Sequence, residues 1–297
     1  MTTTIQPSVK PSLAAPEHLD QAHSTPDTSI NPEEFLQRID DTLGLIAEAN
    51  QIASGWTPVK QIDVSVIVPI HNCRDTIPEV IDRIDEVMPP ATETILIDDG
   101  SVDGSWHYLR GLPQRDNRII LRRRHHHGRG SAIRMGLRHT QGHVVAIQDA
   151  DMAYDPADLL GAIWPILEEQ AEVVYGSRSM RRGGSHRNNL RGGLGNQMGR
   201  LVNRCLTTCS NLTTGLHLSD LETGHKVFLG DLIRSLPLSE TGSGIDAEIT
   251  AKVAKAASTI MEVPTHYTAD LRAPEYSRNV RTAMTTLRSL FTHRNGN

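Results

Sequence analysis

The sequence predicts an α/β protein with a doubly wound, mostly parallel sheet, helices on both faces and a helical N-terminal extension. From residue 63 onward, short β-branched runs alternate with segments of helical periodicity. This is the pattern of parallel strands joined by right-handed helical crossovers. Polar residues directly follow successive strand runs, as expected where the carboxyl ends of strands form a ligand-binding edge. A length of 297 residues allows one large domain or two small ones.

The first 60 residues divide into two predicted parts. Residues 1–30 are rich in Thr, Ser, Pro and Ala without periodicity, which is typical of a flexible tail. The run Asn31-Pro32-Glu33-Glu34 has the order of a helix N-cap, a proline and an acidic first turn. Apolar residues then recur at helical spacing, so residues 31–60 are predicted to form a helical extension with one amphipathic helix over 32–53.

The main domain is predicted over residues 61–278, and its first half shows the clearest pattern. The run from Val64 to Pro69 is typical of a buried parallel strand. The later elements follow from apolar periodicity for helices and short apolar runs for strands. In this half the further predicted strands are 94–97, 118–121 and 144–147, and the predicted helices are 77–87, 104–112 and 130–140.

The second half of the domain mixes the two signals. It is predicted to contain helices at 156–170, 195–209 and 246–256 and strands at 173–175 and 260–263. Residues 279–297 are predicted to form a C-terminal amphipathic helix. Its arginines and single apolar face suit either an anionic membrane surface or packing against the domain.

Composition narrows the classes of function. The chain is 38% hydrophobic and has a net charge of −5, which argues against wholesale disorder and against a general nucleic-acid binder. No apolar run approaches the roughly 18–20 residues needed to cross a bilayer. Three cysteines are few and odd in number, as in a reducing compartment. We therefore expect a cytoplasmic protein, compatible with peripheral contact to the inner face of a membrane.

Basic residues are unevenly distributed. Between Glu172 and Asp220 there is no acidic residue, and this stretch contains Arg178, Arg181, Arg182, Arg187, Arg191, Arg200 and Arg204. Such a stretch predicts a local phosphate site, because guanidinium forks match phosphate oxygens bidentately. A second basic cluster has the sequence RRRHHH over 122–127. Three adjacent histidines do not share one face, so we expect a solvated or phosphate-facing loop there rather than a metal site.

Two acidic pairs directly follow predicted strands. Asp149 and Asp151 come after the strand 144–147, where two carboxylates offer hard oxygen ligands to Mg²⁺ or Mn²⁺ and leave the remaining positions to a diphosphate. Asp98 and Asp99 follow the strand 94–97, where a carboxylate can accept hydrogen bonds from a base or from ribose hydroxyls. Taken alone, each pair also suits an ordinary solvated turn.

Six short motifs occur in order along residues 63–278. They are VSVIVPIHN (64–72), IDDGSVDG (97–104), GRGSA (128–132), QDADMAYDP (148–156), GSR (176–178) and DLETGHKVF (220–228). Each is weak alone, but the ordered set resembles family-2 glycosyltransferases, above all the subset similar to dolichol- or polyprenol-phosphate sugar transferases. The resemblance implies a GT-A fold and a metal-dependent, inverting transfer from a UDP- or GDP-sugar to a polyprenol phosphate, with Mg²⁺ or Mn²⁺ as cofactor.

The resemblance also implies roles for individual residues. Asp149 and Asp151 would bind the metal, and Asp149 would also face the ribose. The implied catalytic residues are Asp151, Arg178 and Asp220, with Arg178 and either Arg187 or Arg191 facing the acceptor phosphate. The implied nucleotide-binding residues are Pro69, His71, Asn72, Asp98, Asp99, Gly128, Arg129 and Gly130, and Thr223 and Gly224 join Asp220 in the sugar and acceptor region.

Two alternative functions stay open. A saccharide or small-molecule hydroxyl acceptor would need a carboxylate base, for which the candidates are Asp220, Asp246 and Glu248. The other alternative is a nucleotide-sugar-binding protein without turnover, because Ala153 stands where related sequences often carry Gln or Glu. A nucleotidyltransferase or an NAD enzyme would need a glycine-rich loop after the first strand, but the residues there are Pro-Ile-His-Asn.

Overall fold

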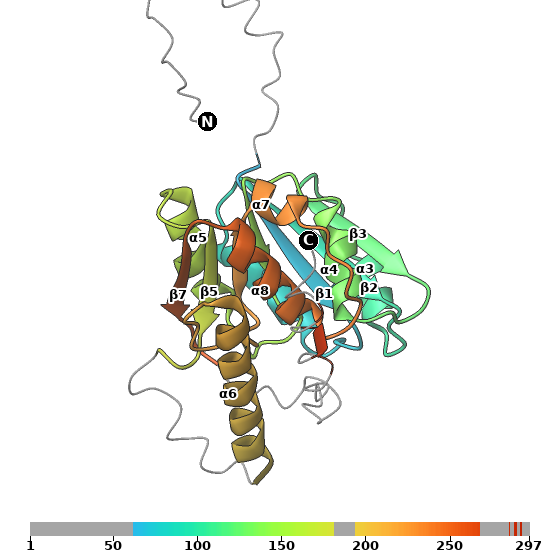
Figure 1. Ribbon diagram of the computed structural model, residues 1–297. Helices are drawn as coiled ribbons and strands as arrows, with labels where there is room; N and C mark the ends of the chain where they lie inside the picture. The colour runs from blue at the N-terminus through green and yellow to red at the C-terminus, as the bar shows by residue number, and fades with distance from the viewer. Residues whose placement is uncertain (1–61, 181–193, 268–284, 286–287, 290–291, 293–297) are drawn as a thin grey trace, which may run out of the picture. The chain divides into compact units, whose positions relative to one another are not determined.

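The computed structural model describes residues 62–180, 194–267, 285, 288–289 and 292, all within the second of the two units into which the chain divides, residues 59–297. At its centre is a seven-stranded sheet of order β3-β2-β1-β4-β6-β5-β7 (Figure 1). The strands are β1 (Val64–Ile70), β2 (Thr92–Asp99), β3 (Arg118–Arg123), β4 (Val144–Ile147), β5 (Val173–Ser177), β6 (Lys226–Leu229) and β7 (Ile260–Pro264). The helices are α2 (Ile77–Val87), α3 (Ser105–Arg110), α4 (Arg129–Leu137), α5 (Pro156–Leu167), α6 (Leu194–Thr214), α7 (Gly230–Ser235) and α8 (Ile245–Ala256).

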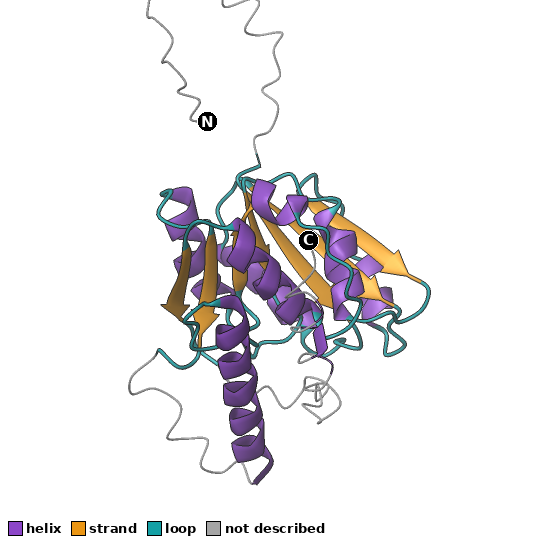
Figure 2. Ribbon diagram, viewed as in Figure 1, coloured by secondary structure: helices purple, strands orange, loops and turns teal. Residues whose placement is uncertain are grey.

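The two faces of the sheet carry separate hydrophobic cores, because side chains alternate along each strand. In β1, Val64, Val66, Val68 and Ile70 belong to the core that α2 and α5 cover. Ile67 belongs to the core on the opposite face, which α4 and α8 cover. Figure 2 shows helices in front of the strands and behind them. The predicted doubly wound sheet with helices on both faces is therefore confirmed.

The carboxyl ends of β1, β2 and β4 lie side by side. These strands are parallel, and Ile70 at the end of β1 pairs with Asp98 near the end of β2. On the other side of β1, Ile67 pairs with Ile147, the last residue of β4. The loops that follow the three strands therefore leave the sheet at one edge, which is where open α/β sheets bind ligands.

The apolar patterns do not predict β6 or α7. β6 runs antiparallel to both β4 and β5, so the sheet is mostly rather than wholly parallel, as expected. The strand has four residues and begins with a buried lysine, so its sequence does not show a continuous apolar run. α6 continues to Thr214, beyond the predicted end at residue 209. Hydroxyls of Thr213 and Thr214 donate to backbone carbonyls one turn earlier in this polar extension.

Several predictions fall outside the described residues. These are the tail over 1–30, the helix over 32–53 and most of the C-terminal helix over 279–297, which all stay predictions. Within the described ranges, no helix combines the length and the apolar character that crossing a membrane requires.

Candidate active site

The candidate site lies at the carboxyl edge of β1, β2 and β4, where hydrogen bonds join the loops after β1 and β2. His71 Nδ1 lies 3.0 Å from the backbone oxygen of Asp99. The Asn72 N–H donates to Ser101 Oγ at 3.0 Å, and Asn72 Oδ1 accepts from the Val102 N–H at 2.9 Å. Asn72 has a left-handed φ of 55°, which asparagine tolerates better than most residues. The structure thus brings together the polar ends of β1 and β2 that the sequence singles out.

The Asp99 carboxylate positions the loop that follows β3. It accepts hydrogen bonds from the backbone N–H groups of His127 at 3.1 Å and Gly128 at 2.7 Å, and it lies 2.9 Å from His126 Nδ1. The same loop packs closely on Gly100, where an added Cβ would lie 2.6 Å from loop backbone atoms. Asp99 therefore uses its oxygens to hold residues 125–128 at the edge of the site.

Asp98 is fully buried, and neither of its carboxylate oxygens has a well-formed hydrogen bond to a described residue. Burial raises the pKa of Asp98, and the nearby Ser101 and Arg122 offset only part of this rise. Arg122 Nε lies 3.6 Å from Asp98 Oδ2. A buried carboxylate with only such weak contacts is costly, and a ligand N–H or hydroxyl that donated to it would offset this cost. Asp98 is therefore suited to the predicted contact with a base or a ribose.

A chain of alternating charges runs from the loop after β4 to α8. Arg129 donates to Asp149 Oδ1 through Nε at 3.2 Å and Nη2 at 3.1 Å, and its Nη1 donates to Asp246 Oδ2 at 2.8 Å. The buried Lys226 donates to Asp246 Oδ1 at 2.9 Å and to the Thr223 carbonyl at 2.8 Å. Burial alone would raise the pKa of Asp246, but the two cations hold it below its ordinary value.

Asp149 and Asp151 offer a partial set of metal ligands. Asp149 commits Oδ1 to Arg129, while its Oδ2 faces Gly224, where an added Cβ would lie 2.5 Å from that oxygen. Asp151 Oδ1 accepts from the Ala153 N–H at 3.1 Å. Among the described residues, no group of three or more His, Cys, Asp or Glu side chains could hold a metal. Mg²⁺ is commonly bound by one or two carboxylates together with waters and substrate phosphates, so this pair fits an ion shared with a diphosphate.

A buried histidine supports the loop that carries the two aspartates. His225 Nε2 lies 2.9 Å from Gln148 Oε1, and His225 Nδ1 lies 3.1 Å from Thr265 Oγ1. Gln148 donates in turn to the backbone carbonyls of Asp149 and Tyr154, both at 3.1 Å. Burial lowers the pKa of His225 to about 4, so the neutral ring donates to Gln148 through Nε2–H. No sequence signal marks this residue except that it stands after Thr-Gly, where the resembling family usually has an aromatic.

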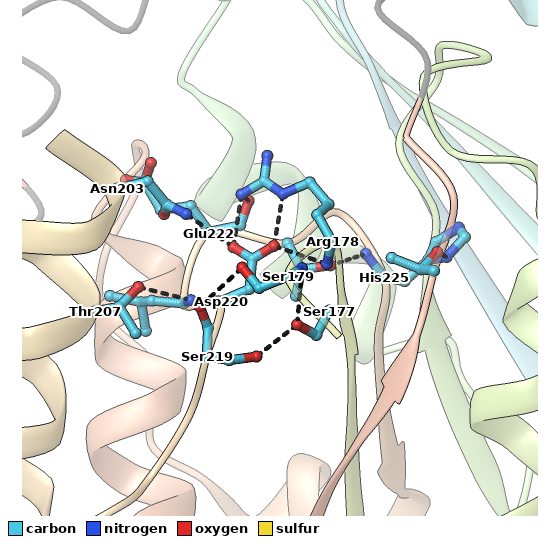
Figure 3. Close-up of polar contacts among 12 residues, drawn as sticks. Ser177, Arg178, Ser179, Asn203, Thr207, Ser219, Asp220, Glu222 and His225 are labelled. Atoms are coloured by element: carbon cyan, nitrogen blue, oxygen red, sulfur yellow. Dashed lines mark hydrogen bonds and ion pairs between the residues drawn. The ribbon is translucent and has the colours of Figure 1, made fainter. Parts of the chain in front are cut away.

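Arg178 and Asp220, two of the implied catalytic residues, form a buried ion pair (Figure 3). Arg178 donates to the two carboxylate oxygens through Nε at 2.5 Å and Nη2 at 2.6 Å, and Asn203 Nδ2 donates to Asp220 Oδ1 at 3.1 Å. Burial alone would raise the pKa of Asp220, but Arg178 holds it below its ordinary value. Arg178 Nη1 makes no hydrogen bond within the described part of the chain, and the guanidinium carbon lies 5.4 Å from the ring centroid of Tyr267.

The two glycines of the motif after β3 allow a close backbone approach. An added Cβ on Gly128, whose φ is +99°, would lie 2.6 Å from the carbonyl oxygen of Thr241. The Gly130 N–H donates to the Gly242 carbonyl at 3.2 Å, and a Cβ on Gly130 would lie 2.7 Å from the carbonyl oxygen of Glu240. In this structure both glycines therefore serve contact with residues 240–242, and their predicted proximity to a nucleotide stays a prediction.

Of the remaining implied residues, the structure describes Pro69 and Thr223. Pro69 is the residue before the end of β1, and it pairs in register with Ile97 of β2. Thr223 is buried, and its Oγ1 accepts from a backbone N–H two residues later. Arg187 and Arg191 lie outside the described residues, so their place relative to the other residues stays a prediction.

Two curated proteins resemble this chain over part of its length. The dodecaprenyl-phosphate galacturonate synthase of Rhizobium johnstonii is 24% identical over 187 residues, which cover 61% of this chain and 52% of the relative. The dolichol-phosphate mannosyltransferase of Pyrococcus furiosus is 28% identical over 121 residues, which cover 40% of this chain and 34% of the relative. The matched region thus spans about half or less of the length of either relative.

Solved structures share the fold. A glucosyl-3-phosphoglycerate synthase of Mycobacterium tuberculosis, in complex with Mn²⁺, UDP and glucosyl-3-phosphoglycerate, matches with a TM-score of 0.59 at 21% identity and covers 78% of this chain and 79% of that one. The mannosyl-3-phosphoglycerate synthase of Rubrobacter xylanophilus matches with a TM-score of 0.54 at 22% identity, covering 77% and 73%. These likenesses confirm the expected GT-A type of fold. The sequence profile of Glycosyl transferase family 2 matches residues 65–220, more than half of the chain, and the protein therefore belongs to this family.

Proposed function

We propose that the protein transfers a sugar, with inversion, from a UDP- or GDP-sugar to a polyprenol phosphate, using Mg²⁺ or Mn²⁺ held by Asp149, Asp151 and the donor diphosphate. The names of two curated relatives refer to dodecaprenyl phosphate and dolichol phosphate, which supports this acceptor class. Solved structures of the same fold contain UDP with Mn²⁺ or Mg²⁺, which supports the donor class and the metal. A lipid acceptor would bring the enzyme to a membrane surface.

The observation that carries the proposal is that three carboxylates are each stabilised as anions. A hydroxyl acceptor would need one of these three residues as its base. Asp220 is paired with Arg178, and Asp246 is paired with two cations. Glu248 is paired with Lys252 at 2.7 Å and accepts backbone N–H groups from residues 239 and 240. Burial alone would raise the pKa of each, yet these partners hold all three pKa values low. Carboxylates stabilised as anions are weak bases, whereas a phosphate acceptor is already ionised and needs none.

On the donor side, the proposal assigns binding and orientation to the residues at the carboxyl edge. Asp98 would receive the base or ribose, and the metal would offset the charge that develops on the leaving diphosphate. Arg129 holds Asp149 in place through two hydrogen bonds to one oxygen. Gly224 leaves room beside the other oxygen. The orientation of this carboxylate is therefore fixed before the donor binds, which reduces the reorganisation needed during transfer.

On the acceptor side, the proposal assigns phosphate binding to Arg178 and to arginines of the acid-free stretch. Two anions, the donor diphosphate and the acceptor phosphate, must approach each other for the reaction. Fixed cations make that approach favourable and orient the attacking oxygen. Asp220 holds the Arg178 side chain in one conformation and leaves Nη1 for the acceptor.

The test is sugar transfer by the full chain. Purified protein would be incubated with labelled UDP- and GDP-sugars and a short-chain prenyl phosphate, in Mg²⁺, in Mn²⁺ or in EDTA. We expect a prenyl-phosphate-linked sugar only when the metal is present, and none with Asp151→Asn. Metal-dependent nucleotide binding without transfer to any acceptor would favour the non-catalytic alternative, to which Ala153 points. Equal transfer in EDTA would overturn the metal assignment.

A further inference from the structure

The cluster of arginines and histidines after β3 lines a cavity that the proposed transfer does not use. The cavity has a volume of about 410 Å³ and is lined by residues from the end of β3, the loop after it and one side of α4. This volume falls within the range of small-ligand sites. None of the residues assigned to the donor or the acceptor lines the cavity. It is therefore a separate feature from the site at the carboxyl edge.

The lining is strongly basic. Its eight residues include no acid, and its cationic or titratable members are Arg123, Arg124, His125, His127, Arg134 and Arg138. The side chains of Arg124, His125 and Arg138 are exposed and have no ion pair or hydrogen bond with any described residue. Four guanidinium groups around one cavity repel each other unless an anion lies between them. The cavity therefore attracts a negatively charged ligand.

Other lining arginines are held in place by the fold. Arg134 Nη1 donates to the Ser239 carbonyl at 2.8 Å. Arg123 Nη1 donates to Ser131 Oγ, and its Nε lies 3.6 Å from Asp99 Oδ1. These contacts fix two guanidinium groups, so less side-chain freedom is lost when an anion binds. The cavity thus combines oriented and unpaired arginines.

We propose that this cavity is a second anion site, which binds a phosphate group of a soluble phosphate compound or of a lipid headgroup. Arginine forks match phosphate oxygens in pairs, and several forks around a cavity favour a phosphate over a monovalent anion such as chloride. The cavity also shares the loop over 125–128 with the donor edge, because Asp99 binds the backbone of that loop. A ligand in the cavity therefore contacts a loop that also borders the donor site.

The test measures anion binding without a metal, so that it is independent of sugar transfer. The probes are inorganic phosphate and pyrophosphate, titrated calorimetrically in EDTA at constant ionic strength, and phosphatidylcholine vesicles with and without phosphatidylglycerol, measured by flotation. The double variant Arg124→Gln/Arg138→Gln removes two exposed, unpaired arginines, so its thermal midpoint should match that of the wild type. Arg110→Gln, an exposed arginine on α3, is the matched control.

We expect saturable binding of at least one probe and a loss of affinity of about tenfold or more in the double variant, with Arg110→Gln and Asp151→Asn unchanged. Binding of the free anions alone would identify a soluble phosphate compound as the ligand, whereas binding to vesicles that requires phosphatidylglycerol would identify a headgroup. No saturable binding of any probe, equal binding by the double variant, or loss of binding in Asp151→Asn would overturn the proposal.

Discussion

The buried pair of Arg178 and Asp220 leads to a quantitative prediction for Asp220→Asn. Asp220 is fully buried and accepts hydrogen bonds from Arg178 and Asn203, whereas the Arg178 side chain is only 11% exposed. The variant keeps the shape of the side chain but leaves the guanidinium charge uncompensated inside the protein. Breaking a buried ion pair from one side costs about 3–5 kcal/mol. For a domain of this size that loss lowers Tm by about 6–20 °C.

The measurement is urea unfolding of the full chain, followed by fluorescence and circular dichroism. The control is Asp231→Asn, because Asp231 is 91% exposed and also pairs with an arginine, at 2.8 Å, so its removal should change stability little. The pKa of Asp220 is lower in the folded chain than its unfolded value of about 3.9, so the contribution of the pair is present above about pH 4 and is lost as the pH falls through the folded pKa. A cost of Asp220→Asn below about 1 kcal/mol at pH 7 would refute the reasoning, since it would mean that Arg178 finds another partner or water.

Three further predictions concern the loop after β4. Gly224→Ala should sharply reduce sugar transfer because its Cβ would displace Asp149 Oδ2, whereas Gly161→Ala, whose new Cβ would meet nothing within 4 Å beyond its own helix backbone and chain neighbours, should leave steady-state rates unchanged. Asp151→Asn should abolish the metal-dependent thermal shift with UDP or GDP. In the wild type, a nucleotide at 100 times its dissociation constant should raise the free energy of unfolding by about 2.7 kcal/mol. His225 should contribute a fall of about 3 kcal/mol in the unfolding free energy between pH 6.5 and pH 4, because the unfolded residue binds a proton that the folded ring, with its pKa lowered to about 4, does not. His225→Phe should remove that pH dependence in urea titrations, and an unchanged slope would contradict the assignment.

The strand and helix pattern of the parallel half could be predicted because its signals are local. β1, β2 and β4 are short apolar runs, and each is followed by polar residues that the sheet brings to one edge. β6 could not be predicted in the same way, because four residues that begin with a buried lysine give no alternating or continuous apolar signal. Lys226 is tolerated there because Asp246, twenty residues later, neutralises it and the Thr223 carbonyl accepts a second hydrogen bond from it.

The sequence predicts which residue types follow the strands at the carboxyl edge, whereas it does not predict their hydrogen-bond and ion-pair partners. Arg178 and Asp220 are 42 residues apart, and nothing in the chain between them indicates a bidentate pair. Arg129 joins Asp149 and Asp246 across 20 and 117 residues, respectively. Such pairings depend on the relative orientation of elements, which composition and periodicity do not encode. The pairings with cations also make the candidate bases weak, which favours a phosphate acceptor over a hydroxyl acceptor.

The most direct test of the central claim is a competition between two acceptors that differ only in their phosphate. A short-chain prenyl phosphate and the corresponding prenyl alcohol would be supplied together, with a UDP- or GDP-sugar and Mn²⁺, and the two products would be separated and counted. If the acceptor must arrive already ionised, the label will appear on the phosphate acceptor, and the alcohol will take up essentially none. Comparable transfer to the alcohol would contradict this account, because it would require a base that the paired carboxylates Asp220, Asp246 and Glu248 do not provide.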